Sequence, residues 1–296
     1  MEQIRYGRKR SGITKELYEK VIDWIESIDD ERVKKLVSRN TIVCGGAIAS
    51  MLLGEQVNDF DLYFRDIETT LAVANYYVNK FKSTEGNQHI ATTVVCEGDR
   101  VIIYTPSAGA AVSADAPPQF DQIESSVLDD ANFTPEDTGT KYRPLFLSEN
   151  AISLSHKVQL ITRFYGEPDE IFDNYDFIHA YNFFDYGSRK LELKPEALEA
   201  ILSRTLIYKG SLYPVASLFR MKKFMNRGWR ISAGQILKIA FQISELDLHD
   251  PKVLREQLTG VDVFFMNALI VALESVDPQV IDASYVAELI DKIFKE

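Results

Sequence analysis

Apolar and polar residues alternate along this chain in two different ways, and the change falls close to residue 193. Before it, short apolar runs separated by turn residues predict strands, and longer runs with helical spacing predict helices. Helices are predicted at 14–38, with Thr14 as N-cap, and at 46–53, 67–81 and 168–172. Strands are predicted at 41–44, 60–64, 89–95, 100–104, 151–155, 158–164, 177–184 and 190–193.

The pattern after residue 193 is almost entirely helical. Pro195 and Pro214 stand where a helix begins, and Gly228 stands where one ends. The predicted helices cover 195–208, 214–227, 232–243, 251–258, 261–276 and 283–295. We therefore expect an α+β domain with a mixed or antiparallel sheet at 1–193, followed by an all-helical region at 194–296.

The composition of the 296 residues is that of a globular protein, with 46% hydrophobic and 26% charged residues. No apolar run approaches the ~20 residues that span a bilayer. The basic N-terminus lacks the apolar core of a secretory signal. Cys44 and Cys96 lack the spacing of a metal site. We expect a cytoplasmic protein without membrane contact, and composition gives no indication of its oligomeric state.

The net charge of −11 conceals a strong segregation of charge. Residues 201–244 contain eight Lys and Arg but no acid, whereas residues 101–140 contain seven acids but no Lys or Arg. Such segregation indicates a phosphate-facing surface in the basic window, with a solvated helix face as the alternative. The acidic stretch, with its proline and small residues, is expected to be a long loop inserted near 105–140.

The stretch CGGAIASMLLGEQVNDFDLYF, residues 44–64, holds the residues best suited to chemistry. Gly45 and Gly46 open a predicted helix, and the backbone N–H groups at a helix N-terminus favour phosphate. Asp59 and Asp61 lie at i and i+2 of a predicted strand, so both carboxylates face one side with Cβ atoms about 6–7 Å apart. Such a pair, with substrate phosphates, suits Mg²⁺ or Mn²⁺. An ordinary turn beside solvated aspartates is the alternative.

This stretch resembles the signature of class II nucleotidyltransferases, the tRNA CCA-adding enzymes and bacterial poly(A) polymerases of the polymerase-β-like superfamily. Their motif reads G-G-x-V-R-D-x-L-L-G, four residues, then D-x-D. The matching residues are Gly45, Gly46, Leu52, Leu53, Gly54, Asp59 and Asp61, with Ile48 for the valine. The whole chain is also similar to nucleotidyltransferase-like proteins encoded by bacteriophages. The resemblance implies a polymerase-β-like nucleotidyltransferase head followed by a helical neck and body.

Three later segments are also similar to the family, although two of its motifs are replaced. The segments are DFIHAYNFFD at 176–185, ALEAILSRTLIYKG at 197–210 and the neck-like PVASLFRMKKFMNRGW at 214–229. The Arg-Asp of the head motif is Ala49-Ser50 here, and the base-selecting Glu-Asp that opens the neck helix is missing from 211–214. We therefore do not expect CTP and ATP selection, or true CCA addition.

Members of the superfamily usually supply a third acid from a neighbouring strand. It helps to hold the catalytic metal and accepts the proton of the attacking hydroxyl. Asp176 is the predicted third carboxylate, with a helix cap or a neck contact as the alternative for it. Asp99 and the acids at 129–130 and 136–137 are weaker candidates.

Arg220, Lys223 and Arg227 share one face of a predicted helix, at i, i+3 and i+7. We expect this face to bind a nucleoside triphosphate or an RNA backbone, with Arg204 as a further contributor. His179 is interpreted as a core histidine rather than a phosphate ligand.

Together these residues predict a metal-dependent nucleotidyltransferase. Asp59, Asp61 and Asp176 would serve catalysis, Asp59 and Asp61 would hold Mg²⁺ or Mn²⁺, and Gly45 and Gly46 would cradle the NTP. The acceptor hydroxyl stays open between an RNA or tRNA 3′ end, a protein side chain and a small molecule. The alternative is a nucleotidyltransferase fold that acts as a nucleotide-, RNA- or protein-binding module. A phage-encoded protein of either kind would act in the host cytoplasm.

Overall fold

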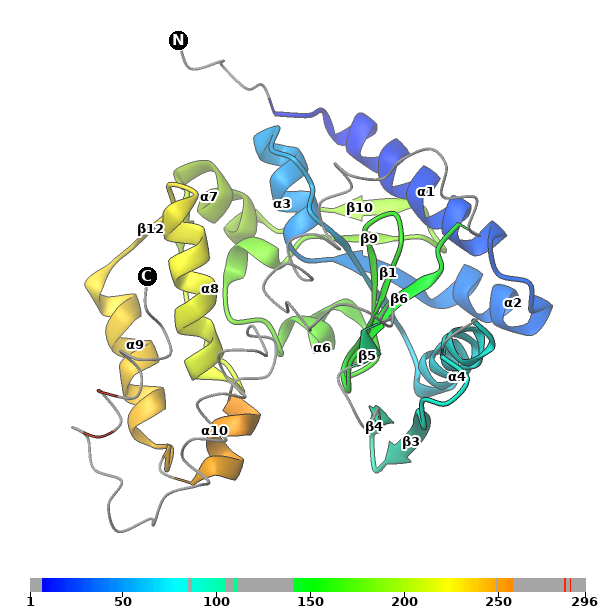
Figure 1. Cartoon of the computed structure of the whole chain (residues 1–296). Coiled ribbons are helices and arrows are strands. Elements are labelled where there is room, and N and C mark those ends of the chain that lie inside the picture. Colours follow the sequence, from blue (N-terminus) through cyan, green and yellow to red (C-terminus); the bar gives the residue numbers. More distant parts are fainter. Residues whose placement is uncertain are drawn as a thin grey trace. The chain divides into compact units, whose positions relative to one another are not determined.

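The structure is a computed structural model that describes residues 7–84, 87–104, 109–110, 141–248, 250–257, 285 and 288 (Figure 1). The described residues form two compact units. Unit 1 takes those up to 110, those at 141–174 and His179–Leu202. Unit 2 takes Tyr175–Ile178 and the described residues from Ser203 onward. The domain boundary at residue 193 stays a prediction.

Unit 1 is built on an eight-stranded sheet with the strand order β10-β9-β1-β2-β8-β7-β6-β5. The strands are β1 Thr41–Cys44, β2 Phe60–Phe64, β5 Gly109–Ala110, β6 Pro144–Leu147, β7 Ala151–Leu154, β8 Val158–Ile161, β9 Phe183–Asp185 and β10 Lys190–Glu192. Of these pairings, β2 with β8 is parallel and the others are antiparallel. The expected α+β fold with a mixed sheet is therefore confirmed, although β6 was not predicted.

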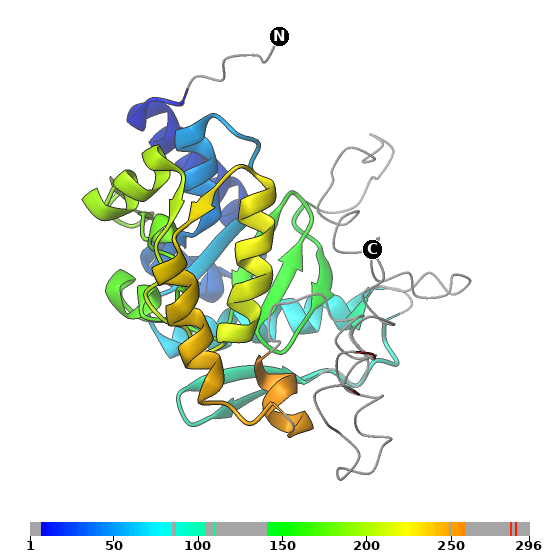
Figure 2. The same ribbon diagram turned by 90° about the vertical axis from the view of Figure 1, so that its left-hand side faces the viewer.

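Six helices and a separate hairpin complete the described part of unit 1. The helices are α1 Arg10–Glu26, α2 Glu31–Asn40, α3 Gly46–Leu53, α4 Ile67–Ser83, α6 Pro168–Phe172 and α7 Pro195–Ser203. The hairpin pairs β3 Thr93–Glu97 with β4 Arg100–Tyr104 and packs beside α4 (Figures 1 and 2).

One face of the sheet packs on α1 and α4 to form the core. The fully buried residues that the eight-stranded sheet gives to this cluster are Val43, Leu62, Phe64, Ile152, Leu160 and Phe184. Trp24 of α1 is also fully buried, and its indole N–H donates to the hydroxyl of Tyr77 on α4 at 2.8 Å. The opposite face carries polar side chains such as Asp61 beside the buried residues Ile42, Cys44 and Tyr63.

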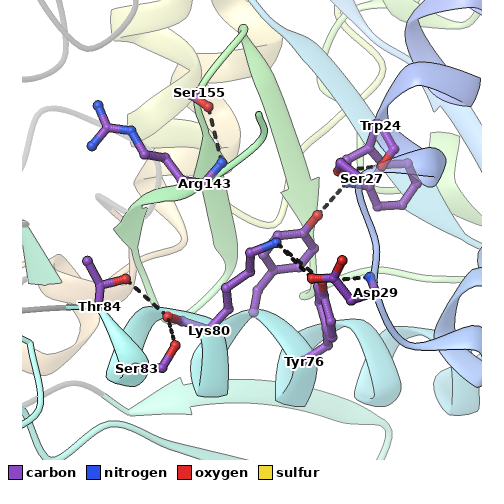
Figure 3. A network of polar contacts seen from close by, with 10 residues as sticks. Trp24, Ser27, Asp29, Tyr76, Lys80, Ser83, Thr84, Arg143 and Ser155 are labelled. Carbon is purple, nitrogen blue, oxygen red and sulfur yellow. Dashed lines mark hydrogen bonds and ion pairs between the residues drawn. The ribbon is translucent and has the colours of Figure 1, made fainter. Parts of the chain in front are cut away.

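Polar contacts fasten the C-terminal end of α1 to α4 (Figure 3). The backbone N–H of Asp29 donates to the hydroxyl of Tyr76 at 3.1 Å, and Lys80 Nζ donates to the same hydroxyl at 3.3 Å. Lys80 Nζ also lies 5.4 Å from the centre of the Tyr76 ring. These contacts hold the two helices that cover the core.

The helix predicted at 14–38 is wrong in its extent, because the structure has two helices there. Helix α1 begins at Arg10, so Thr14 is not its N-cap, and the Thr14 hydroxyl instead donates to the Arg10 carbonyl at 2.9 Å. The break comes at Asp30, whose carboxylate accepts from two backbone N–H groups in the first turn of α2. A capping aspartate inside an otherwise helical pattern was the available signal.

Unit 2 is mostly helical in its described part, as predicted. Its elements are β11 Thr205–Leu206, α8 Pro214–Asn226, β12 Arg230–Ile231, α9 Ala233–Ser244 and α10 Pro251–Gln257. The segment Tyr175–Ile178 joins them through a bridge between Phe177 and Tyr208, whose rings meet edge to face at 5.7 Å. Trp229 is buried and packs edge to face on Phe224 at 5.5 Å.

Several predicted elements differ from those of the structure. The helix predicted at 195–208 ends at Ser203, because Arg204 adopts a left-handed conformation (φ 47°) and β11 follows. The strand predicted at 177–184 is a 3₁₀ turn, Ile178–Ala180, followed by β9. The predicted helix at 261–276, all but two residues of the one at 283–295 and most of the acidic loop near 105–140 lie outside the described residues.

Candidate active site

The glycine turn and the aspartate pair come together at one end of the β1–β2 pair. The two strands are antiparallel, and Cys44 at the end of β1 lies opposite Asp61 near the start of β2. The next residues of the chain, Gly45 and Gly46, therefore lie beside Asp59, which directly precedes β2. The glycine turn and the aspartates are separated in sequence by α3, and the pairing of β1 with β2 brings them together.

The sharp turn after β1 depends on Gly45. This residue has φ 87° and ψ −155°, a backbone conformation that residues other than glycine do not adopt without strain. Gly46 then opens α3, which ends at Gly54 in a left-handed conformation with φ 68°. The backbone N–H groups of the first turn of α3 are therefore presented next to the aspartates, as phosphate binding requires.

The aspartates occupy the sheet face that does not pack on the core. Phe60, Leu62 and Phe64 of β2 are buried in the core, with Phe64 and Leu62 fully so. Because side chains alternate along a strand, Asp59 and Asp61 face the other side, and both are half-buried. This alternation is the one that the sequence predicts.

The neighbours of Asp61 in the sheet are not acidic. Across the sheet Asp61 pairs with Cys44 on β1 and with Gln159 on β8, and Gln159 pairs in turn with Ser153 on β7. Paired residues of adjacent strands face the same side, so the Gln159 amide lies next to the Asp61 carboxylate. Among the described residues, no three His, Cys, Asp or Glu side chains gather in a group that could hold a metal ion.

Sequence reasoning missed Gln159. The sequence predicts a strand at 158–164, which includes Gln159. The position of Gln159 beside Asp61 follows only from the parallel pairing of β2 with β8. An amide also has no charge to draw attention to it. The position next to Asp61 on the neighbouring strand therefore carries a neutral amide and not a third carboxylate.

Asp176, the predicted third carboxylate, belongs to unit 2 and forms an ion pair there. Its Oδ2 accepts from Arg220 Nε at 2.6 Å, and its backbone carbonyl accepts from the Lys209 N–H at 2.9 Å. The predicted catalytic acid and one of the predicted nucleotide-binding residues are therefore bonded to each other. The roles of Asp176 and Arg220 in catalysis and nucleotide binding stay predictions.

The other predicted basic residues also lie on or beside α8. Lys223 is exposed, and the Arg227 guanidinium lies 5.4 Å from the centre of the Phe224 ring. Arg204 Nη1 donates to the carbonyl of Arg227 at 3.2 Å, so these two arginines are neighbours. His179, in unit 1, is buried with 2% of its surface exposed, in line with its interpretation as a core histidine.

Other acids of unit 1 are occupied elsewhere or lie apart. Asp185 on β9 accepts from Arg65 Nη2 at 3.0 Å, and Arg65 also pairs with Glu167. Burial alone would lower the pKa of Arg65, but its bonds to Glu167 and Asp185 raise it overall. Asp99 lies in the exposed turn between β3 and β4. The acids at 129–130 and 136–137 lie outside the described residues.

The donor set fits a hard divalent cation bound together with a phosphorylated substrate. Asp59, Asp61 and Gln159 offer carboxylate and amide oxygens from one sheet face, and Mg²⁺ prefers oxygen ligands. The turn at Gly45 and Gly46 offers N–H donors for the phosphates. Among the described helices, none is long and apolar enough to cross a bilayer.

Comparisons with known proteins give a family and a set of structural neighbours. The model of a family described as Gabija anti-defense 2 family protein matches residues 15–204. Gabija anti-defense 2 of Bacillus phage SPbetaL7 is 20% identical over 236 residues, which are 79% of this chain and 45% of that protein. The chain thus spans less than half the length of this curated relative.

Two solved structures among those similar to this chain are CCA-adding enzymes. The Thermotoga maritima enzyme complexed with tRNA is 11% identical, with a TM-score of 0.40 over 92% of this chain and 53% of that chain. The Bacillus stearothermophilus enzyme in complex with CTP is 13% identical, with a TM-score of 0.39 over 85% of this chain and 51% of that chain.

Proposed function

The chain belongs to the Gabija anti-defense 2 family, and we propose that it counteracts the Gabija defence by transferring a nucleoside monophosphate from an NTP to a hydroxyl acceptor. The observation that carries the chemistry is the β1–β2 register, which sets the Gly45–Gly46 turn beside Asp59 and Asp61. A phosphate cradle and a pair of carboxylates in this arrangement suit the triphosphate of an NTP better than any uncharged ligand. The host cytoplasm is the proposed place of action.

In this proposal each residue has a stated task. Asp59 and Asp61 hold the metal ion, and the N–H groups at the start of α3 bind the triphosphate. Gln159 lends a neutral oxygen beside Asp61. A bound Mg²⁺ or Mn²⁺ supplies neutralisation of the negative charge that builds up on the phosphates. The acceptor oxygen forms a bond to the α-phosphorus while the bond to the bridging oxygen breaks, and pyrophosphate leaves.

The proton of the acceptor hydroxyl needs a base. Gln159 is not one, because an amide does not accept a proton at neutral pH. Within unit 1 the Asp61 carboxylate, which lies beside Gln159, is the proposed acceptor of this proton, directly or through water. The predicted participation of Asp176 belongs to the same proposal, and its Oδ2 accepts from Arg220 Nε at 2.6 Å.

The proposal is tested by transfer of label from each of the four α-³²P-labelled NTPs, with Mg²⁺ or Mn²⁺, to total RNA and to protein. Label on RNA would identify an RNA or tRNA 3′ end as acceptor, and label on protein a side-chain hydroxyl. We expect the label to disappear in the Asp59→Asn/Asp61→Asn variant. The charge-matched control is Asp169→Asn/Asp173→Asn, which neutralises two exposed acids of unit 1 and should leave transfer unchanged.

A second candidate function is favoured by Gln159. A neutral amide beside Asp61, and no three-acid group among the described residues, suit a site that binds an NTP without turning it over. In that case no acceptor is labelled above the level of the double variant. Metal-dependent NTP binding, measured by calorimetry, would still be lost in Asp59→Asn/Asp61→Asn and kept in the control.

A further inference from the structure

An open cavity of about 700 Å³ lies on unit 1 where the start of α1 meets the turn between β9 and β10. Arg10, Ser11, Thr14, Lys15 and Tyr18 of α1 line it together with Arg189 of the turn. Arg10 fastens the two elements together, because its Nη2 donates to the Leu191 carbonyl of β10 at 2.6 Å. The cavity is wide open to solvent, so a ligand there is held by charge and hydrogen bonds at a surface and not by enclosure.

The cavity is cationic although the chain as a whole is acidic. Its lining includes Arg10, Lys15 and Arg189, and none of the described residues that line it is acidic. Lys15 Nζ lies 3.6 Å from Glu19 Oε1, and this exposed ion pair is weak. In a chain with a net charge of −11, three cations around one cavity point to an anionic ligand.

The Arg189 guanidinium is held in place by aromatic stacking. It lies 4.7 Å from the centre of the Tyr18 ring, and Tyr18 stacks on Tyr186 with ring centres 5.5 Å apart and planes 12° apart. A stacked guanidinium keeps the N–H groups of its edge available for hydrogen bonds. It also loses little conformational entropy when a ligand binds, because it is already ordered.

The backbone of the turn contributes to the same placement. Arg189 adopts a left-handed conformation with φ 58°, which is uncommon and costly for a residue with a side chain. Ser11 and Thr14 add hydroxyl groups to the lining. The first turn of α1 contains no acid, so the helix dipole adds to the positive potential of the three cations.

We propose that this cavity, the Arg10–Arg189 site, binds the phosphate groups of a nucleotide or of a nucleic-acid strand. A guanidinium pairs with two oxygens of a phosphate or of a carboxylate alike. Phosphate is favoured here because a terminal phosphate carries about two negative charges, against one for a carboxylate, and so suits three neighbouring cations better. Tyr18 is occupied by Tyr186 and Arg189, so the proposal assigns it no stacking with a base; the site recognises the phosphates. The site does not depend on Asp59 and Asp61, and so it stands whether or not the chain transfers nucleotides.

The test is calorimetry of the whole protein in EDTA, so that metal-dependent binding at Asp59 and Asp61 does not contribute. The probes are pyrophosphate, ADP, a short single-stranded RNA and a peptide of Asp and Glu. We expect pyrophosphate and ADP to bind, and Arg10→Ala/Arg189→Ala to weaken them at least about tenfold, as the loss of charge-assisted hydrogen bonds predicts. Asp59→Asn/Asp61→Asn should bind them as tightly as the wild type.

The control Arg32→Ala/Arg100→Ala removes two exposed arginines of unit 1 and should leave affinity unchanged. Arg189→Lys keeps the charge but loses the planar guanidinium, so its affinity for pyrophosphate should lie between those of the wild type and the double variant. This milder variant keeps the test informative if the double variant folds poorly. Tight binding of the RNA alone would identify a strand as the source of the phosphates. Equal affinity of the double variant and the control, or binding of the acidic peptide without competition by pyrophosphate, would overturn the proposal.

Discussion

Gly45 and Gly46 are adjacent residues with different tasks, and single substitutions should separate them. Gly45→Ala should cost about 1–3 kcal/mol of unfolding free energy, because φ 87° with ψ −155° is strained for alanine. A methyl at Gly46 would meet no atom within 4 Å, and alanine is the better helix former by roughly 0.5–1 kcal/mol. Gly46→Ala should therefore be as stable as the wild type or more so, as urea unfolding would measure.

The same methyl at Gly46 would project into the open space where the triphosphate is proposed to lie. We expect Gly46→Ala to lose affinity for NTP–Mn²⁺ while it keeps its stability. Wild-type NTP affinity in this variant would show that the turn does not cradle phosphates.

Gln159 offers a gain-of-function test of the metal site. Gln159→Glu places a third carboxylate beside Asp61 and should tighten Mn²⁺ binding on the order of tenfold, because a negative charge replaces a neutral oxygen. Mn²⁺ titration followed by electron paramagnetic resonance measures this. The control Gln88→Glu adds the same charge at an exposed position. An equal effect of both substitutions would contradict the placement of Gln159 at the ion.

At the residue scale, the sequence was sufficient for those parts of the site that are close in sequence. The Gly45–Gly46 turn, the strand at 60–64 and the alternation of Asp59 and Asp61 with buried apolar residues all appear as predicted. Gln159 could not be predicted, because the pairing of β2 with β8 joins residues nearly a hundred positions apart. Side-chain alternation is local, whereas strand order is set by the packing of the whole sheet.

At the scale of elements, α1 is tied to the start of β6 through Asp23. Lys141 Nζ lies 3.0 Å from Asp23 Oδ1, and the Tyr142 hydroxyl donates to Asp23 Oδ2 at 2.8 Å. Burial by itself would raise the pKa of Asp23, but the bonds from Lys141 and Tyr142 lower it overall. The carboxylate is therefore bound more favourably in the folded state than in the unfolded chain.

A lowered pKa in the folded state gives stability that is present above the unfolded-state pKa and lost as the pH falls through the folded-state value. Asp23→Asn should thus be less stable than the wild type at pH 7. The difference should begin to shrink as the pH falls below about 4 and be smallest below the lowered folded-state pKa of Asp23. Urea midpoints across this range check it. A gap of the same size in acid would exclude the ionisation of Asp23 as its cause.

Arg220 ties α8 to the Tyr175–Ile178 segment through the largely buried Asp176. Arg220→Ala should cost about 1–3 kcal/mol, because a mostly buried acceptor loses its partner. The exposed Lys223→Ala is the matched control on the same helix.

Asp176→Asn tests the predicted catalytic role separately: a fall in Mn²⁺ affinity would support Asp176 as the third carboxylate, and an unchanged affinity would contradict that role.

Elements were predicted well where their ends carry local signals and less well where a signal lies inside a pattern. Gly54 and Gly228 end α3 and α8 as expected, both with positive φ. The break at Asp30 interrupts an apolar periodicity that would continue through it, and the left-handed Arg204 ends α7 without a glycine. In both cases the break is a local backbone feature, a capping side chain or a positive φ, that hydrophobic periodicity does not report.

At the scale of the whole molecule, charge is segregated in two different ways. The basic window at 201–244 is visible in the sequence because its residues are contiguous. The Arg10–Arg189 site is not visible, because its cations are far apart in the sequence. They come together where α1 contacts β10 and the turn before it. Counting charges along the sequence finds clusters of contiguous residues, but not clusters that form only when distant segments fold together.

The proposed function makes its last prediction in cells. In bacteria that carry a Gabija system, expression of this chain should restore plaque formation by a Gabija-sensitive phage. If transfer or binding at the Asp59–Asp61 site is the means, Asp59→Asn/Asp61→Asn should fail to restore plaques at equal protein level, and Asp169→Asn/Asp173→Asn should succeed. Restoration by the double variant would move the activity away from this site. Arg10→Ala/Arg189→Ala in the same assay would then show whether the second, cationic site carries it.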